Sequence, residues 1–186
     1  MKPHPIIGLA TGLALLLPLS AMAHDWQVDS AASTLGFKGS YQGESFDGKF
    51  GKFNAMIAYD ANDLSKAKFD VTIDLASSDT GNGDRDESLQ GSDFFDVKKT
   101  PTAHFVTESF AKAADGGVEA TGKLTIRDKT APVVLKVRFV ETGDKATLDV
   151  DTVLKRADYG LGAGSDWSDV GAEVPVHGHL ALSAGP

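Results

Sequence analysis

The densest group of ionisable side chains lies in the stretch SSDTGNGDRDESLQ, which holds four acids and one arginine between Ser77 and Gln90. Calcium binds carboxylate and amide oxygens, and four residues match ligand positions of an EF-hand-type loop: Asn82, Asp84, Asp86 and Asp93. Glu87, however, stands where that loop needs a glycine, and Arg85 would bring a cation among the ligands. The stretch therefore favours helix caps and an ion pair between Arg85 and a carboxylate.

Histidines offer a second route to metal chemistry. His177 and His179 lie two residues apart, so on a strand their side chains share one face and could chelate one ion. Their apolar neighbours alternate with them, which places the pair on the outer face of the strand. Cleavage after Ala23 would also make His24 the N-terminal residue, whose amine and imidazole could bind copper. A metal-binding or catalytic protein using these histidines is the alternative function, although no metal site is predicted.

The patterns that mark common catalytic centres are missing. The chain has no cysteine, which excludes thiol catalysis and thiolate metal sites. No serine stands in a Gly-x-Ser-x-Gly turn, and no Gly-rich phosphate loop opens a helix. Acids are plentiful, but none stands out as the general acid of a carboxylate pair for glycoside hydrolysis. We therefore predict no catalytic residue, no cofactor and no enzyme activity.

The first 23 residues have the pattern of a secretory signal peptide. Lys2 precedes a short apolar run, Ile6–Leu19, and Ala21-Met22-Ala23 gives the small-x-small site of a signal peptidase. The run is too short for a transmembrane helix, and no other run is long enough. We expect cleavage after Ala23, a periplasmic protein, and one domain over residues 24–186 with no integral membrane segment. A formal net charge of −8 argues against nucleic acid as a partner.

Alternation of apolar and polar residues predicts strands along most of this domain. In Lys68–Leu75 every second residue is apolar, which is typical of a strand with one buried face. Similar or weaker runs lie at 34–38, 46–59, 104–110, 118–126, 133–139, 148–151 and 174–182, with Gly, Asn and Asp turns between several of them. About eight antiparallel strands form either a sandwich or a barrel. Glycines inside the strands, Gly48, Gly51, Gly122 and Gly178, favour closure because they allow sharp bending.

Residues 77–100 interrupt the strands and contain the predicted helices. Asp84 is predicted to cap a short helix through Leu89, and Ser92 a second turn through Asp96. Excursions of this length between strands are usually lids or binding loops. The fold class is thus all-β, with one or two short helices. Its inward apolar faces could form either a filled core or a tunnel, and composition does not separate the two.

Several motifs together resemble the YceI-like family of exported, polyisoprenoid-binding, lipocalin-like barrels. The resemblance covers about residues 25–182. Its first part is carried by Trp26-Gln27-Val28-Asp29, Ser33-Thr34-Leu35 and Gly48-Lys49-Phe50. The excursion contributes Thr80, Asn82, Arg85-Asp86, Leu89, Asp93-Phe94-Phe95-Asp96-Val97 and Pro101, followed by Phe105. The last part is Gly122-Lys123-Leu124-Thr125-Ile126-Arg127, Thr130, Pro132-Val133 and Arg156-Ala157-Asp158-Tyr159-Gly160.

The resemblance implies an extended eight-stranded antiparallel barrel that holds a long isoprenoid, quinone or acyl chain for transport or storage. Phe94-Phe95 would plug one end of it, and a homodimer would be compatible with the family. Inward positions make ten residues candidates for lining the ligand: Phe37, Phe53, Ile57, Phe69, Val71, Ile73, Leu135, Val137, Leu148 and Leu180. Four residues are candidates for a polar head group: Arg127, Arg156, Asp158 and Tyr159. An Arg156–Asp158 ion pair would explain two of them equally well, and a structural or stress-response protein with a filled barrel is a third alternative.

Overall fold

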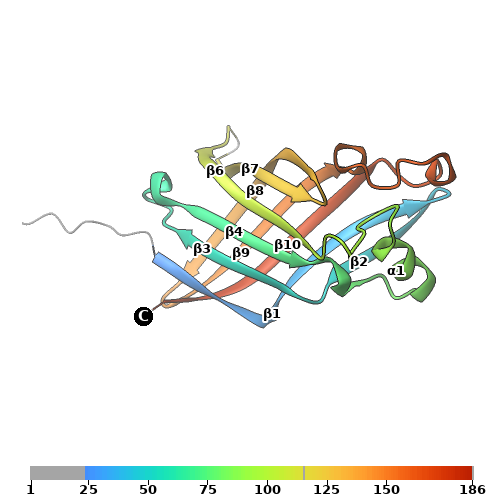
Figure 1. The fold of residues 1–186 in the computed structure, drawn as a ribbon. Helices are drawn as coiled ribbons and strands as arrows, with labels where there is room; N and C mark the ends of the chain where they lie inside the picture. The colour runs from blue at the N-terminus through green and yellow to red at the C-terminus, as the bar shows by residue number, and fades with distance from the viewer. Residues whose placement is uncertain (1–23, 115, 186) are drawn as a thin grey trace, which may run out of the picture.

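Eight antiparallel strands close into an elongated barrel in the computed structural model, which describes residues 24–114 and 116–185 (Figure 1). Around the ring the strands follow the order β1–β3–β4–β6–β7–β8–β9–β10, and β10 pairs again with β1. Their bounds are β1 His24–Tyr41, β3 Phe53–Tyr59, β4 Lys68–Asp74, β6 Thr102–Lys112, β7 Val118–Ile126, β8 Lys129–Thr142, β9 Lys145–Lys155 and β10 Glu173–Ala184. The predicted eight-stranded, all-β barrel is therefore confirmed.

Strand β1 is long enough to take two partners in turn on one side. Its first residues pair with β3, so that Trp26 lies opposite Ile57. Its last residues pair with β2 (Glu44–Phe50), so that Phe37 lies opposite Gly48. A two-residue strand, β5 (Ser78–Asp79), adds to the free edge of β2. The barrel wall is thereby prolonged beyond the closed ring at the end where β2 lies (Figure 1).

One α-helix, α1 (Gly83–Gln90), lies beside this prolonged end. Its N-cap is Asn82, whose side-chain oxygen accepts a hydrogen bond from Arg85 N at 3.1 Å, so the prediction of Asp84 as the cap is wrong. The second predicted turn, at Ser92–Asp96, is present as hydrogen-bonded turns and not as a helix. Four short 3-10 helices complete the described part of the chain: η1 Leu64–Lys66, η2 Leu75–Ser77, η3 Arg156–Tyr159 and η4 Ser165–Trp167. No helix within the described ranges has the length and apolar character needed to cross a membrane.

The arginine of the acidic stretch does not form the predicted ion pair. The Arg85 guanidinium lies 3.9 Å from the centroid of the Phe46 ring, and within the described residues no carboxylate comes within ion-pair distance of it. An arginine over an aromatic face is held by the negative quadrupole of the ring. Arg85 therefore fastens α1 to β2, while the Asp86 carboxylate accepts hydrogen bonds from Thr80 N and Oγ1 at 2.8 and 2.7 Å.

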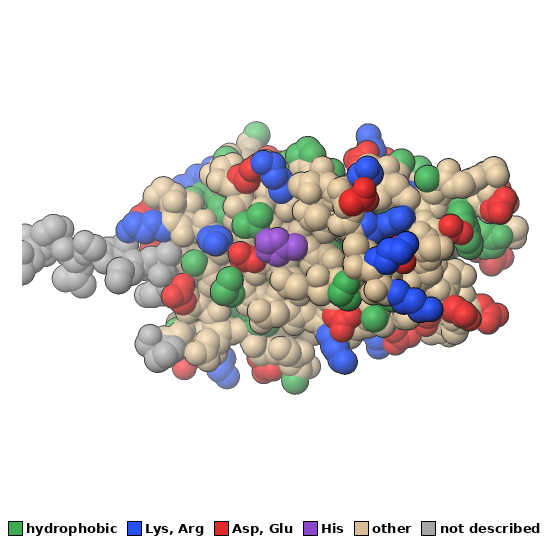
Figure 2. Space-filling model, viewed as in Figure 1, with side chains coloured by type: hydrophobic (Ala, Val, Ile, Leu, Met, Phe, Trp, Pro, Cys, Tyr) green, Lys and Arg blue, Asp and Glu red, His purple; other side chains and the backbone are tan. Residues whose placement is uncertain are grey.

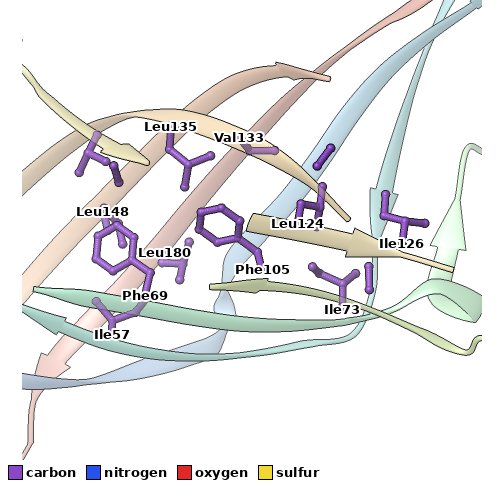
Figure 3. Packing of buried hydrophobic residues seen from close by; sticks show 14 of the residues in the cluster. Ile57, Phe69, Ile73, Phe105, Leu124, Ile126, Val133, Leu135, Leu148 and Leu180 are labelled. Atoms are coloured by element: carbon purple, nitrogen blue, oxygen red, sulfur yellow. The ribbon is translucent and has the colours of Figure 1, made fainter. Parts of the chain in front are cut away.

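A cluster of aromatic rings packs the barrel near the described chain ends, and we call this region the filled end. Ring centroids lie 4.5 Å apart for Tyr59 and Phe139, 4.9 Å for Phe69 and Phe110, and 5.2 Å for Trp26 and Phe139. The Trp26 indole N–H also donates to Tyr59 O at 3.1 Å. Figure 3 shows side chains of opposite strands, Phe69 among them, directed into this interior. The filled end satisfies its one buried indole and leaves little free space.

Candidate ligand cavity and its side opening

An apolar cavity of about 210 Å³ occupies the other half of the barrel, next to α1, and we call this region the hollow half. Ile73, Leu124 and Ile126 line it and are seen pointing inward from β4 and β7 (Figure 3). Almost the whole lining is apolar, and the polar side chains in it are Ser40, Thr152, Arg156 and Tyr159. A concave, largely apolar space with a few polar groups is the usual form of a small-molecule site.

Glycines explain why this half stays open although it contains many phenylalanines. Phe37 lies directly opposite Gly48, and Phe46 directly opposite Gly39, in the β1–β2 ladder. A Cβ atom on either glycine would overlap the facing ring, so the outer edge of each ring lies over a glycine of the neighbouring strand. The glycines thus let these rings approach the wall, and the Phe37 ring also packs against the Phe50 ring, with centroids 5.3 Å apart. Strand glycines commonly mark such close approach.

The ten residues predicted to line a ligand divide between the two regions. Six of them line the cavity: Phe37, Phe53, Val71, Ile73, Leu135 and Leu180. The other four lie outside its lining, in the packed core: Ile57, Phe69, Val137 and Leu148. Alternation identified the inward face but carries no information about position along the barrel axis. Contact between these six residues and a ligand stays a prediction.

Sequence reasoning missed part of the lining. Phe50 and Leu154 both line the cavity and continue alternating patterns, so their inward positions could have been found. Val170 also lines it, but stands alone in a loop rich in Gly, Ser and Asp and gives no periodic signal. Phe94 and Phe95 are buried and line the cavity beside α1, as the family resemblance implied for an end plug.

Arg156 closes the hollow half by binding backbone carbonyls. Its Nε donates to Gly171 O at 3.1 Å, and its two terminal nitrogens donate to Leu161 O (2.8 Å), Gly162 O (2.6 Å), Trp167 O (3.1 Å) and Val170 O (3.1 Å). A guanidinium has five N–H donors, so this network uses all of them. The proposed Arg156–Asp158 ion pair is therefore not formed. Arg156 fixes residues 161–171 over the cavity.

The other head-group candidates are not brought together around one point. Arg127 lies in the β7–β8 turn, in the left-handed region at φ 56°, and its Nη1 donates to Phe94 O at 3.2 Å. Asp158 is exposed and lines an outer groove. Both arginines thus hold cap segments through carbonyls, and only Arg156 and Tyr159 of the four line the cavity.

Tyr159 is a polar residue of the lining whose hydroxyl forms no hydrogen bond with the described residues. Its side chain is 2% exposed, and no residue in the described ranges forms a hydrogen bond with its hydroxyl. Burial, with the nearby Asp158 carboxylate, raises the pKa of Tyr159 to about 12. The phenol therefore stays protonated at any physiological pH and remains a hydrogen-bond donor.

The barrel wall opens beside Tyr159, between β8 and β9. The ladder of these two strands ends at the pair Lys136–Asp151, while β8 continues toward its N-terminus beside β7 alone. At this point the Thr152 hydroxyl donates to Val134 O at 2.9 Å, in place of a backbone donor. Pro132 follows on the unpaired edge, where a residue without an N–H is tolerated. Helix η3 contacts β8 across the gap.

An outer groove of about 820 Å³ meets the cavity at this opening. Val133, Thr152, Leu154 and Tyr159 line both spaces. The groove crosses the outer faces of β8, β9 and β10, and its charges are mixed: His177 is hydrogen-bonded to Asp151 at 2.8 Å, and a Lys38–Asp47 pair lies at 3.4 Å. Mixed charge also covers the face of the barrel drawn in Figure 2, where hydrophobic side chains are scattered. The side opening thus joins an apolar interior to a polar exterior.

The alternative metal sites find no support in the described residues. His177 and His179 each bind their own carboxylate, Asp151 at 2.8 Å and Asp149 at 2.6 Å. Within residues 24–114 and 116–185 no three potential ligand side chains gather around one point, which also covers the calcium-loop candidates. The side chain of His24 and the predicted signal peptide lie outside what the structure describes.

Comparison with known proteins places this geometry among related barrels. The family model described as the YceI-like domain matches residues 26–182. A UPF0312 protein of Vibrio vulnificus strain YJ016 is 32% identical over 181 residues, covering 91% of this chain and 96% of that protein. The crystal structure of Burkholderia cenocepacia BcnA is 32% identical with a TM-score of 0.78, and the match covers 83% of this chain and 99% of BcnA.

A more distant structure has the same fold. It is a polyisoprenoid-binding domain from Saccharophagus degradans, implicated in plant cell wall breakdown. The TM-score is 0.67 at 19% identity, and the match covers 89% of this chain and 100% of that domain. At this identity the likeness concerns the barrel architecture.

Proposed function

Because the chain belongs to the YceI-like family, we propose that it is a carrier that holds a long apolar chain, of isoprenoid, quinone or acyl type, inside the barrel. The observation that carries the proposal is the apolar cavity of the hollow half. A core filled along its whole length, as the structural alternative requires, would not leave this space. The polyisoprenoid-binding domain from Saccharophagus degradans, with the same fold, supports an isoprenoid as the ligand.

The driving force is removal of the chain from water. Burial gains about 25 cal/mol per Å² of apolar surface, reduced by the cost of ordering the ligand. The cavity volume of about 210 Å³ lies below the range usual for sites of drug-sized ligands. A long isoprenoid would therefore fill the hollow half with part of its length and leave through the opening beside Tyr159.

We propose binding without chemical transformation of the ligand. The cavity lining contains no acid, histidine or cysteine side chain that could act as a general base or acid. Its one charged group, Arg156, is held by backbone carbonyls. Transport or storage is the role that such a lining supports best.

We further propose that the protein acts in the periplasm, which the signal-peptide pattern of residues 1–23 supports. N-terminal sequencing of protein recovered from a periplasmic fraction should begin at His24. Protein that keeps Met1 and stays in the cytoplasm would contradict export. The homodimer compatible with the family stays a prediction, which sedimentation of the mature protein would test.

The carrier proposal is tested by native mass spectrometry of protein purified from the cell that makes it. Compounds that co-purify with the protein are extracted and identified. We expect a stoichiometric lipid, absent from Val176→Phe, because Val176 lines the cavity and a larger ring would fill it. Val140→Phe is the matched control, because Val140 is exposed on the outer face of β8. Protein at its bare mass, with no uptake of added polyprenyl compounds, would reject the proposal.

A further inference from the structure

We infer that the hollow half selects ligands whose polar end is neutral, and that the Tyr159 hydroxyl binds an oxygen atom of that end. The inference rests on the proposed carrier function and narrows its ligand class. The ligand is a long apolar chain ending in a quinone, an ester or an alcohol, and not in a phosphate or carboxylate.

The first argument is the lack of an available cation in the cavity. Arg156 is the one charged side chain among the lining residues, and all five of its N–H donors are bound to carbonyl oxygens. An anion that enters an apolar space loses its hydration and needs donors in return. The guanidinium keeps its charge, but the directions in which it could form a forked bond with a phosphate are occupied.

The second argument is the presence of an unused neutral donor. Tyr159 is buried, and its hydroxyl has no hydrogen-bond partner among the described residues. The hydroxyl therefore keeps its donor and acceptor capacity for a ligand oxygen at that point. Of the other hydroxyl-bearing residues of the lining, Thr152 already donates to Val134 O, and Ser40 is a neutral group as well.

The third argument is the position of Tyr159 at the side opening. It lines both the cavity and the outer groove, so a polar group placed there can lie at the boundary while part of the chain fills the cavity. Burial raises the pKa of the Tyr159 phenol, and the Asp158 carboxylate raises it further. A negatively charged head group at the same point would meet the same repulsion from Asp158, although Lys136 and Lys155 also line the groove.

The test compares ligands that differ in their polar end. Isothermal titration of the mature protein would use geranylgeraniol, menaquinone-4 and geranylgeranyl phosphate, which share one C20 chain, with squalene as a hydrocarbon without a head group. We expect the alcohol and the quinone to bind at least about tenfold more tightly than the phosphate, and squalene to bind detectably. Phosphate binding that equals or exceeds that of the alcohol would overturn the inference.

Variants then assign the effect to the phenol. Tyr159→Phe keeps the ring and should weaken the alcohol and the quinone about five- to tenfold, leaving squalene unchanged. Tyr41→Phe, at an exposed tyrosine, is the matched control and should change neither. Equal affinities of wild type and Tyr159→Phe for the alcohol and quinone would also overturn the inference. If squalene and all three C20 ligands fail to bind, the carrier proposal itself fails, and this inference fails with it.

Discussion

The filled end and the hollow half of the barrel are built from the same strands and the same residue types, yet one is packed and the other open. At the filled end, phenylalanine and tyrosine rings meet each other across the interior, as Phe69 and Phe110 do. In the hollow half, Phe37 and Phe46 lie over glycines of the neighbouring strand. A glycine opposite the ring thus lets Phe37 and Phe46 approach the wall, although Phe37 also contacts the Phe50 ring at 5.3 Å between centroids.

This difference separates stability from binding. Trp26, Tyr59 and Phe69 of the filled end are almost fully buried against other protein atoms, so their burial stabilises the fold. The rings of the hollow half have a free face toward the cavity, and part of their burial awaits a ligand. Variants in the first region should lower the free energy of unfolding, and variants in the second should lower affinity.

The largest expected effect is loss of stability on truncation at the filled end. Phe69 is 1% exposed and contacts Tyr59 and Phe110, so Phe69→Ala should cost about 3–5 kcal/mol of unfolding free energy. Phe53→Ala in the hollow half should cost about 1–2 kcal/mol, because Phe53 is half-buried and already borders free space. Urea denaturation of ligand-free protein measures both. Equal losses would show that the two regions do not differ energetically.

The second effect concerns the cap that Arg156 holds over the hollow half. Arg156→Lys keeps the charge but cannot reproduce five forked donors, and should cost about 2–3 kcal/mol. Amide hydrogen exchange should rise in residues 161–171 and stay slow at the filled end. Lys155→Arg, at the exposed neighbouring position, is the control for charge and side-chain size. Unchanged exchange in 161–171 would contradict the fastening role of Arg156.

The third prediction concerns a substitution that should reduce the free volume of the hollow half. In Gly48→Ala the new methyl group overlaps the Phe37 ring, which must leave the wall and turn into the cavity. We expect about tenfold weaker binding of a polyprenyl ligand, with a stability change of about 1 kcal/mol or less. Gly83→Ala, where a Cβ meets nothing within 4 Å, is the control. Unimpaired binding by Gly48→Ala would refute the idea that glycines keep the cavity open.

Much of this contrast could have been predicted from the sequence, and the reason for the rest is physical. Alternation placed Phe37 and Phe69 on inward faces correctly. The two-residue turn at Gln42-Gly43 also fixes the β1–β2 register, so the pairing of Phe37 with Gly48 was within reach. The hydrogen bonds of Arg156 could not have been predicted, because their acceptors are backbone carbonyls of a loop without a periodic pattern. The position of a side chain along the barrel axis depends on contacts between strands that are distant in the sequence.

The smallest effect tests whether the outer face contributes to either region. The His104 imidazole, bonded to the Asp70 carboxylate at 2.8 Å, and Lys68 hold the pKa of Asp70 below its ordinary value. A carboxyl with a lowered folded-state pKa stabilises the protein above its unfolded pKa, and this contribution is lost as pH falls through the folded value. Asp70→Asn should therefore cost less than about 1 kcal/mol at pH 7 and nothing near pH 2.

Thermal unfolding of wild type and Asp70→Asn between pH 2 and pH 7 measures this difference. Asp47→Asn, whose exposed partner is Lys38, serves as the control and should differ little from wild type at any pH. The Phe69→Ala loss should be the same at both ends of the pH range, because it comes from packing. If Asp70→Asn lowered the free energy of unfolding equally at every pH, Asp70 would act through packing as well. The outer face would then contribute to the stability of the filled end.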